Sequence, residues 1–172
     1  MTTIKLISVG ALALSLVGYT AYQSNTTKEN TIAVVPQSSA TLPDFMVKTD
    51  QGKTVNLKNF KGKKVFVNLW ATWCGPCRRE MPSIEALYNK TKGKKVEFVM
   101  LSLDDDFNKA INYKSTNKFT MPMYYPAGNM PALFNVDGIP ATFVFDEKGE
   151  LVKTIQGSTN YDTQDFVNLL TK

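Results

Sequence analysis

Cys74 and Cys77, separated by two residues, are the only cysteines in the 172-residue chain, in the stretch NLWATWCGPCRREMP. A pair with this spacing can serve as zinc ligands, as a structural disulfide or as a redox couple. The chain has no histidine, so it lacks the further nitrogen and sulfur ligands of a structural zinc site. A disulfide across two residues closes too small a loop to stabilise the fold much. The residues therefore favour a redox pair.

The elements predicted around the cysteines fit this chemistry. The apolar run at 64–70 predicts a buried strand that ends with Trp70 in the core, and helical spacing predicts a helix over 74–91. Cys74 is then exposed at the helix start, where unpaired N–H groups and the helix dipole favour its thiolate. Cys77 lies one turn deeper. We expect Cys74 to attack a substrate disulfide and Cys77 to resolve the mixed disulfide.

Further elements alternate along the chain. The pattern predicts two short strands, a second buried strand, a helix that begins with carboxylates, a hairpin and a terminal helix. These cover, in order, residues 44–60, 96–103, 104–119, 141–157 and 160–172. The order of strands and helices predicts an α/β sandwich with a mixed central sheet.

The N-terminus differs in character from the rest. Lys5 is followed by an uncharged run to Thr27, and its most apolar part, Leu6 to Tyr22, is just long enough to span a bilayer. Gly18 and Thr20 make a poor cleavage site. We expect residues 1–22 to be an uncleaved membrane anchor, with a cleaved signal as the alternative. Either one exports the rest of the chain and leaves Lys5 on the cytoplasmic side.

The remaining chain divides into two parts. Residues 23–41 are polar with prolines and are interpreted as a linker, and residues 42–172 form one domain. An apolar content of 43% suits a globular core. The net charge of +5 comes from scattered lysines without interleaved aromatic residues, so we expect no nucleic-acid partner.

Several motifs resemble a known family. The sequence WCGPC is similar to the thioredoxin active-site signature, and the blocks at 42–82 and 138–152 resemble the extracytoplasmic TlpA/ResA/DsbE-like branch of thioredoxin-fold proteins. The resemblance covers residues 42–172 and is loose over 104–135. It implies a thioredoxin-like three-layer α/β sandwich behind an N-terminal hydrophobic helix. It also implies a protein-disulfide oxidoreductase that uses no cofactor and no metal.

The resemblance singles out Glu80, three residues after Cys77 and on the same helix face. Burial near the sulfurs would raise the pKa of this carboxyl and allow it to exchange a proton with Cys77. Without the resemblance, a solvated glutamate paired with Arg78 or Arg79 is the simpler interpretation. Thioredoxin has a buried aspartate where this chain has Asn68.

Residues on both sides of the cysteines are expected to contact substrate. Trp73 is predicted on the exposed rim, and Gly75 and Pro76 lie between the two cysteines. The resemblance implies a cis peptide bond before Pro140, in a loop packed beside the cysteines. The backbone of this loop could pair with an extended substrate, and Ile139 could supply an apolar contact.

The intervening Gly75-Pro76 pair also predicts the direction of electron flow. Strongly oxidising members of the fold stabilise their thiolate, often with a histidine between the cysteines, and this chain has none. We therefore expect a reductase. The resemblance implies an exported, disulfide-containing protein as substrate, with cytochrome c maturation as one role in the family. It also implies a thiol-electron donor in the membrane.

Two other functions stay open. A copper(I) chaperone could combine the cysteines with Met121, Met123 and Met130, since thiolate and thioether ligands suit this metal. The simpler interpretation is that these methionines pack a loop. A peroxide-reducing enzyme of the same fold is the other alternative, although CGPC does not match the lone cysteine of peroxiredoxins.

Overall fold

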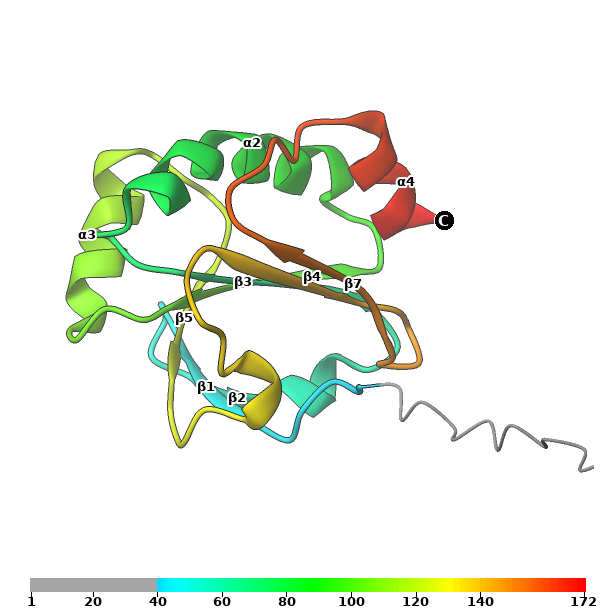
Figure 1. Cartoon of the computed structure of the whole chain (residues 1–172), viewed down its shortest axis with the longest axis horizontal. Coiled ribbons are helices and arrows are strands. Elements are labelled where there is room, and N and C mark those ends of the chain that lie inside the picture. Colours follow the sequence, from blue (N-terminus) through cyan, green and yellow to red (C-terminus); the bar gives the residue numbers. More distant parts are fainter. Residues whose placement is uncertain (1–39) are drawn as a thin grey trace, which may run out of the picture. The chain divides into compact units, whose positions relative to one another are not determined.

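A computed structural model of the chain describes residues 40–172 (Figure 1). The predicted hydrophobic helix at 1–22 and nearly all of the predicted linker at 23–41 lie outside these residues. Within residues 40–172, no helix has both the length and the apolar character needed to cross a lipid bilayer.

One mixed sheet of seven strands forms the centre of the described domain, in the order β2-β1-β5-β4-β3-β6-β7. The neighbours β3, β4 and β5 run parallel, and all other neighbours are antiparallel. The strands are β1 Met46–Thr49, β2 Thr54–Asn56, β3 Lys64–Trp70, β4 Val96–Ser102, β5 Met123–Pro126, β6 Ala141–Phe145 and β7 Leu151–Gln156. This confirms the predicted α/β fold with a mixed sheet.

The two faces of the sheet are covered differently. Helices α2 (Gly75–Thr91) and α4 (Gln164–Thr171) pack together over one face, and α3 (Phe107–Thr116) adds to the same core (Figure 1). Short 3-10 helices, η1 (Leu57–Phe60) and η2 (Ala132–Phe134), contribute to a second core on the opposite face. The domain is therefore the predicted three-layer sandwich, with a third layer of short turns and loops.

Strand β3 shows why the sequence folds in this way. Its side chains alternate between the two faces of the sheet, and both faces are buried, which explains the continuous apolar run. Phe66 and Trp70 belong to the core under the helices, whereas Val65, Val67 and Leu69 belong to the opposite core.

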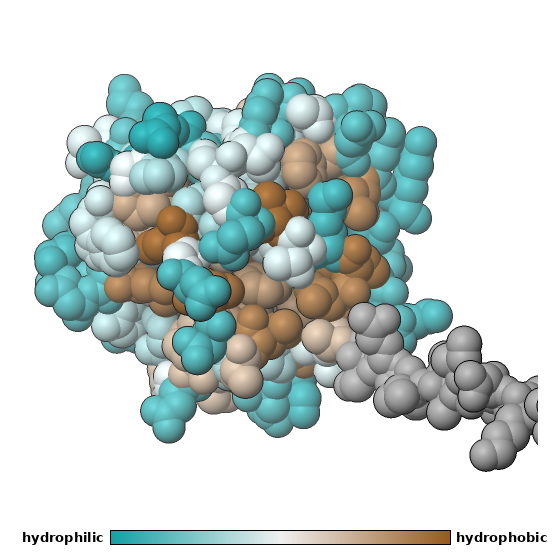
Figure 2. Space-filling model, in the orientation of Figure 1, coloured by the Kyte–Doolittle hydropathy of each residue, from teal (hydrophilic) through white to brown (hydrophobic). Residues whose placement is uncertain are grey.

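Apolar side chains also gather in the middle of one outer face of the domain, with polar side chains around its outline (Figure 2).

Two details differ from the sequence prediction. Strand β5 was not predicted, because it is short and owes its extended form to pairing with β1 and β4. The predicted helix over 104–119 is shorter, because Asp106 caps it by accepting a hydrogen bond from the Asn108 N–H. Asp104 and Asp105 therefore precede α3 instead of forming its first turn.

Candidate active site

The two cysteines lie where β3 leads into α2. Cys74 is the N-cap residue of the helix, and its Sγ accepts a hydrogen bond of 3.2 Å from the Cys77 N–H. Pro76 lies in the first helical turn, where its missing N–H leaves no hydrogen bond unmade. Cys74 and Cys77 form a disulfide. The strand, the turn and the helix start thus hold both sulfurs at one end of the sheet.

The exposure of the residues around the disulfide falls from the rim inward. Trp73 is 66% exposed, and Trp70 is fully buried, as predicted for both. Cys77 is 0% exposed, but Cys74 is only 5% exposed, so the prediction of an exposed Cys74 was wrong for the disulfide form. A neighbouring loop accounts for this cover, because the Ile139 carbonyl oxygen lies 3.6 Å from the Cys74 Sγ.

This loop precedes strand β6. The peptide bond between Ile139 and Pro140 is cis, as the resemblance implied. The Pro140 carbonyl accepts a hydrogen bond of 2.9 Å from the Gly157 N–H, and the Gly138 carbonyl accepts one of 2.7 Å from the Gln156 side chain. These bonds fix the loop against the neighbouring chain and place Ile139 beside Cys74.

Glu80 lies inside the domain, one turn along α2 from Cys77. The residue is 2% exposed, so the interpretation of a solvated glutamate was wrong. Its Oε1 accepts a hydrogen bond of 2.9 Å from the Asn68 Nδ2, and its Oε2 accepts one of 3.2 Å from the Thr159 N–H. Desolvation raises the pKa of Glu80 to about 7, and these hydrogen bonds oppose the shift in part. A carboxyl with such a pKa can both give and take a proton near neutral pH.

A chain of buried polar groups continues from Glu80. The Asn68 Nδ2 also donates to the Thr142 Oγ1 at 2.9 Å, and this hydroxyl lies 2.6 Å from the Tyr161 hydroxyl. Desolvation and the neighbouring Glu80 raise the pKa of Tyr161. Thr142 and Tyr161 were not predicted from the sequence. The one available signal was Thr142, a polar residue in the otherwise apolar strand ATFVF.

An apolar groove of about 430 Å³ lies beside the disulfide. It includes Trp73, which is next to Cys74 in the chain, and Ile139, which contacts the Cys74 sulfur. The remaining apolar side chains are Leu103, which directly follows β4, and Met130, Phe134 and Val136 from the segment before Pro140. Of these residues, only Trp73 and Ile139 were predicted from the sequence to contact substrate, because the segment that supplies most of the others resembles the family loosely.

The methionines of the copper(I) alternative are divided between the two cores. Met121 and Met123 are fully buried in the core under the helices, together with both cysteines. Met130 packs in the opposite core and lines the apolar groove. The described residues also contain no group of three His, Cys, Asp or Glu side chains placed to hold a metal ion. The three methionines therefore pack against other apolar side chains, which supports the simpler interpretation of them as packing residues.

Comparisons with known proteins agree with this arrangement. The family described as Redoxin matches residues 37–170. The thiol-disulfide oxidoreductase ResA of Bacillus thuringiensis subsp. konkukian is 34% identical over 157 residues, which cover 90% of this chain and 88% of that protein. The thioredoxin-like protein YneN of Bacillus subtilis is 38% identical over 145 residues, covering 81% and 83%.

A solved structure gives the same picture at the level of the fold. The thiol:disulfide interchange protein of the thioredoxin family from Chlorobium tepidum TLS superposes with a TM-score of 0.64 at 26% identity. The match covers 77% of this chain and 96% of that one. The shared region thus includes nearly the whole of the solved domain.

Proposed function

Because the chain belongs to the redoxin family and is a thiol-disulfide oxidoreductase of the ResA type, we propose that it works as a reductase of protein disulfides. The observation that carries this proposal is the Cys74–Cys77 pair at the start of α2, with Gly75 and Pro76 between the two cysteines in the chain and the buried Glu80 one helical turn further on.

The reaction consumes the dithiol form of the pair. The Cys74 thiolate attacks one sulfur of the substrate disulfide, forming a mixed disulfide and releasing the other substrate sulfur as a thiolate that takes up a proton. Cys77 then loses its proton and attacks the Cys74 sulfur, which releases the second substrate thiol. Two electrons and two protons thus pass to the substrate, and the enzyme keeps the Cys74–Cys77 disulfide.

The helix start and Glu80 have separate parts in this scheme. The Cys77 N–H that bonds the Cys74 Sγ stabilises the charge of the attacking thiolate. Glu80, one helical turn beyond Cys77, accepts the proton that Cys77 must lose before it attacks. With a pKa of about 7, the carboxyl is present in both protonation states near neutral pH.

The residues between the cysteines support the direction of electron flow. Gly75 and Pro76 carry no positive charge, and the chain contains no histidine that could stabilise the thiolate. A dithiol without such stabilisation is easily oxidised, so it gives up its electrons readily.

The surface beside Cys74 supports an extended protein segment as substrate. Trp73 is next to Cys74 in the chain, the Ile139 carbonyl lies beside the Cys74 sulfur, and both residues line the apolar groove. A disulfide with an apolar side chain near its cysteine would bury that side chain in the groove. The backbone of the loop before Pro140 is the candidate partner for the substrate backbone. The disulfide of an apocytochrome c is one candidate substrate.

The N-terminal sequence supports a proposal for the location of the protein and for its electron donor. We propose that residues 1–22 anchor the protein in the membrane, that residues 23–41 are a tether and that residues 42–172 act outside the cytoplasm. An exported reductase must be reduced again after each turnover, so its donor is a membrane protein that carries thiol electrons across the bilayer.

A redox titration of the full-length protein in mild detergent tests the direction. Against glutathione or dithiothreitol buffers, we expect a midpoint near that of thioredoxin, roughly −270 mV. A midpoint above about −180 mV, which is typical of protein disulfide isomerase, would show an oxidase or isomerase instead. A Cys77→Ala variant, which stalls the mixed disulfide, would then capture the substrate for identification.

A further inference from the structure

We propose that Asp104 is a positioning residue for substrate binding, because its buried carboxylate holds the turn at residues 71–74, which joins β3 to α2 and carries Trp73. The proposal rests on the proposed function, in which the rim beside Cys74 contacts a protein disulfide.

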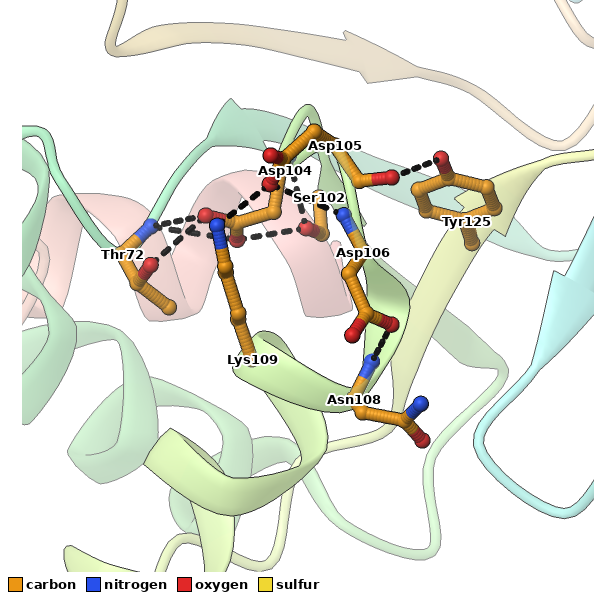
Figure 3. Close-up of polar contacts among 8 residues, drawn as sticks. All are labelled: Thr72, Ser102, Asp104, Asp105, Asp106, Asn108, Lys109 and Tyr125. Carbon is orange, nitrogen blue, oxygen red and sulfur yellow. Dashed lines mark hydrogen bonds and ion pairs between the residues drawn. The ribbon is translucent and has the colours of Figure 1, made fainter.

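Donors from two parts of the chain converge on Asp104, which is 3% exposed (Figure 3). The Thr72 N–H reaches both carboxylate oxygens, at 3.1 and 3.2 Å, and the Thr72 hydroxyl donates to Oδ1 at 2.6 Å. The Ser102 hydroxyl, at the end of β4, donates to Oδ2 at 2.8 Å. A carboxylate suits this set because it only accepts hydrogen bonds, whereas an amide would turn an N–H group towards one of the donors.

The segment that carries this carboxylate is itself fixed on its far side (Figure 3). The Asp105 carbonyl accepts a hydrogen bond of 3.3 Å from the Tyr125 hydroxyl on β5. Asp106 caps α3 through its bond of 2.9 Å from the Asn108 N–H. Asp104 thus follows β4 directly, and the two residues after it are bonded to β5 and to α3. Because this segment is held in place, the bonds from Asp104 to Thr72 restrain the turn.

The position of Trp73 depends on this restraint more than the position of Cys74 does. The Cys74 N–H donates to the Ala71 carbonyl at 3.1 Å, and Cys74 is also held by its place in α2 and by the Ile139 loop. The Trp73 side chain is 66% exposed, so little packing fixes its direction. Its orientation therefore depends on the backbone at Thr72, which Asp104 holds.

The restraint also determines the shape of the apolar groove. Trp73 and Leu103 both line it, and Asp104 follows Leu103 directly while bonding the residue before Trp73. The Leu103 N–H also donates to the Trp70 carbonyl at 2.8 Å. The Asp104–Thr72 contact extends this link to the residue before Trp73 and so restrains the spacing of the two groove residues. Loss of this contact should weaken the binding of apolar groups beside a substrate disulfide and leave the chemistry at Cys74 unchanged.

Single-turnover oxidation of the reduced full-length protein tests this separation. The substrates are two synthetic peptide disulfides, one with leucines flanking each cysteine and one with serines in their place. The half-saturating concentration and the limiting rate are measured for each. We expect the wild-type protein to favour the leucine peptide. In the Asp104→Asn variant, the half-saturating concentration of the leucine peptide should rise about five-fold. The limiting rate with the leucine peptide, and both constants for the serine peptide, should stay within about two-fold of the wild-type values.

Variants at Thr72 make the test independent of the folding of Asp104→Asn. Thr72→Val removes the hydroxyl donor and should shift the leucine peptide in the same direction, whereas Thr72→Ser keeps the donor and should behave as wild type. The matched control is Asp146→Asn, which disturbs a carboxylate that holds the β6–β7 turn by accepting from the Lys148 and Glu150 N–H groups.

Other outcomes would overturn the proposal. Equal losses with both peptides, a fall in the limiting rate alone, or unchanged constants in Asp104→Asn and Thr72→Val would each show that Asp104 does not position the groove. If neither peptide oxidises the reduced wild-type protein, the proposed reductase function is refuted, and this proposal with it.

Discussion

The side-chain amide of Asn68 on β3 donates a hydrogen bond of 2.9 Å to the carboxylate of Glu80 on α2, in the interior of the domain. The contact joins the central strand to the helix that carries both cysteines. This hydrogen bond lowers the pKa of Glu80, whereas desolvation raises it. Desolvation has the larger effect, so the pKa of Glu80 is about 7.

The raised pKa of Glu80 predicts a specific dependence of stability on pH. In the unfolded chain this carboxyl ionises near its ordinary pKa of 4.5, whereas in the folded domain it keeps its proton up to about pH 7. The folded state therefore binds more protons over this window, and stability falls as pH rises through it. Relative to Glu80→Gln, the free energy of unfolding should drop by about 2 to 3 kcal/mol between pH 5 and pH 8.

Denaturant unfolding of the oxidised protein at both pH values measures this difference. Because the glutamine side chain of the variant does not titrate, the comparison removes the contribution of every other ionisable group. A difference between the two proteins that is constant with pH would show that Glu80 ionises at its ordinary pKa.

Replacement of Glu80 should also slow the second step of disulfide exchange. Glu80→Gln cannot accept the Cys77 proton, so the release of a mixed disulfide from Cys74 should slow by on the order of 100-fold at neutral pH. Stopped-flow measurement of product release checks this. Glu85→Gln is the control, because Glu85 lies on the same helix but holds Thr120 and Met121. Similar slowing in both variants would point to a general effect on the helix.

The two cysteines should differ in reactivity once the disulfide is reduced. Cys77 is completely buried, whereas Cys74 retains 5% exposure and lies at the helix N-terminus. We expect iodoacetamide to modify Cys74 at least about ten times faster, since its thiolate is favoured and reachable. Peptide mapping by mass spectrometry after brief alkylation gives the ratio. Equal modification, or earlier modification of Cys77, would contradict the assignment of Cys74 as the attacking residue.

A cation placed between the cysteines should raise the midpoint potential. Pro76→His adds a positive charge near the Cys74 sulfur, which stabilises the reduced, thiolate-bearing form. We expect a rise of at least about 30 mV, equivalent to about 1.4 kcal/mol for a two-electron couple. Pro76→Ser, which removes the proline ring without adding charge, separates the two effects. If both variants shift the potential equally, charge is not the cause.

The N-terminal segment should keep the protein in the membrane with its domain outside the cytoplasm. In intact cells with reduced thiols, a membrane-impermeant maleimide should label Cys74, and the protein should sediment with membranes. Replacing Leu6 to Tyr22 with a cleavable signal sequence should release it. A soluble mature protein with a new N-terminus near Tyr22 would identify the segment as a cleaved signal, and protection from the maleimide would contradict export.

Local sequence was enough to predict the strand, turn and helix start that carry Cys74 and Cys77. The apolar run of strand β3, the helix start at Cys74 and Pro76 in the first turn depend on neighbouring residues, so periodicity and spacing reveal them. The cis bond before Pro140 was predicted only through the family resemblance, because a proline before a strand is compatible with either isomer.

Tertiary structure decided the features that join distant parts of the chain. The burial of Cys74 comes from a loop 65 residues later in sequence, and Thr142 meets Asn68 only because β6 pairs with β3. Asp104 resembled a helix-start carboxylate in sequence, yet it bonds Thr72 across the β3–β4 pairing. The chemistry of the cysteines could be predicted from local sequence because propensity and spacing act over a few residues. Burial and hydrogen bonding depend on long-range packing, so the surroundings that tune this chemistry emerged only from the fold.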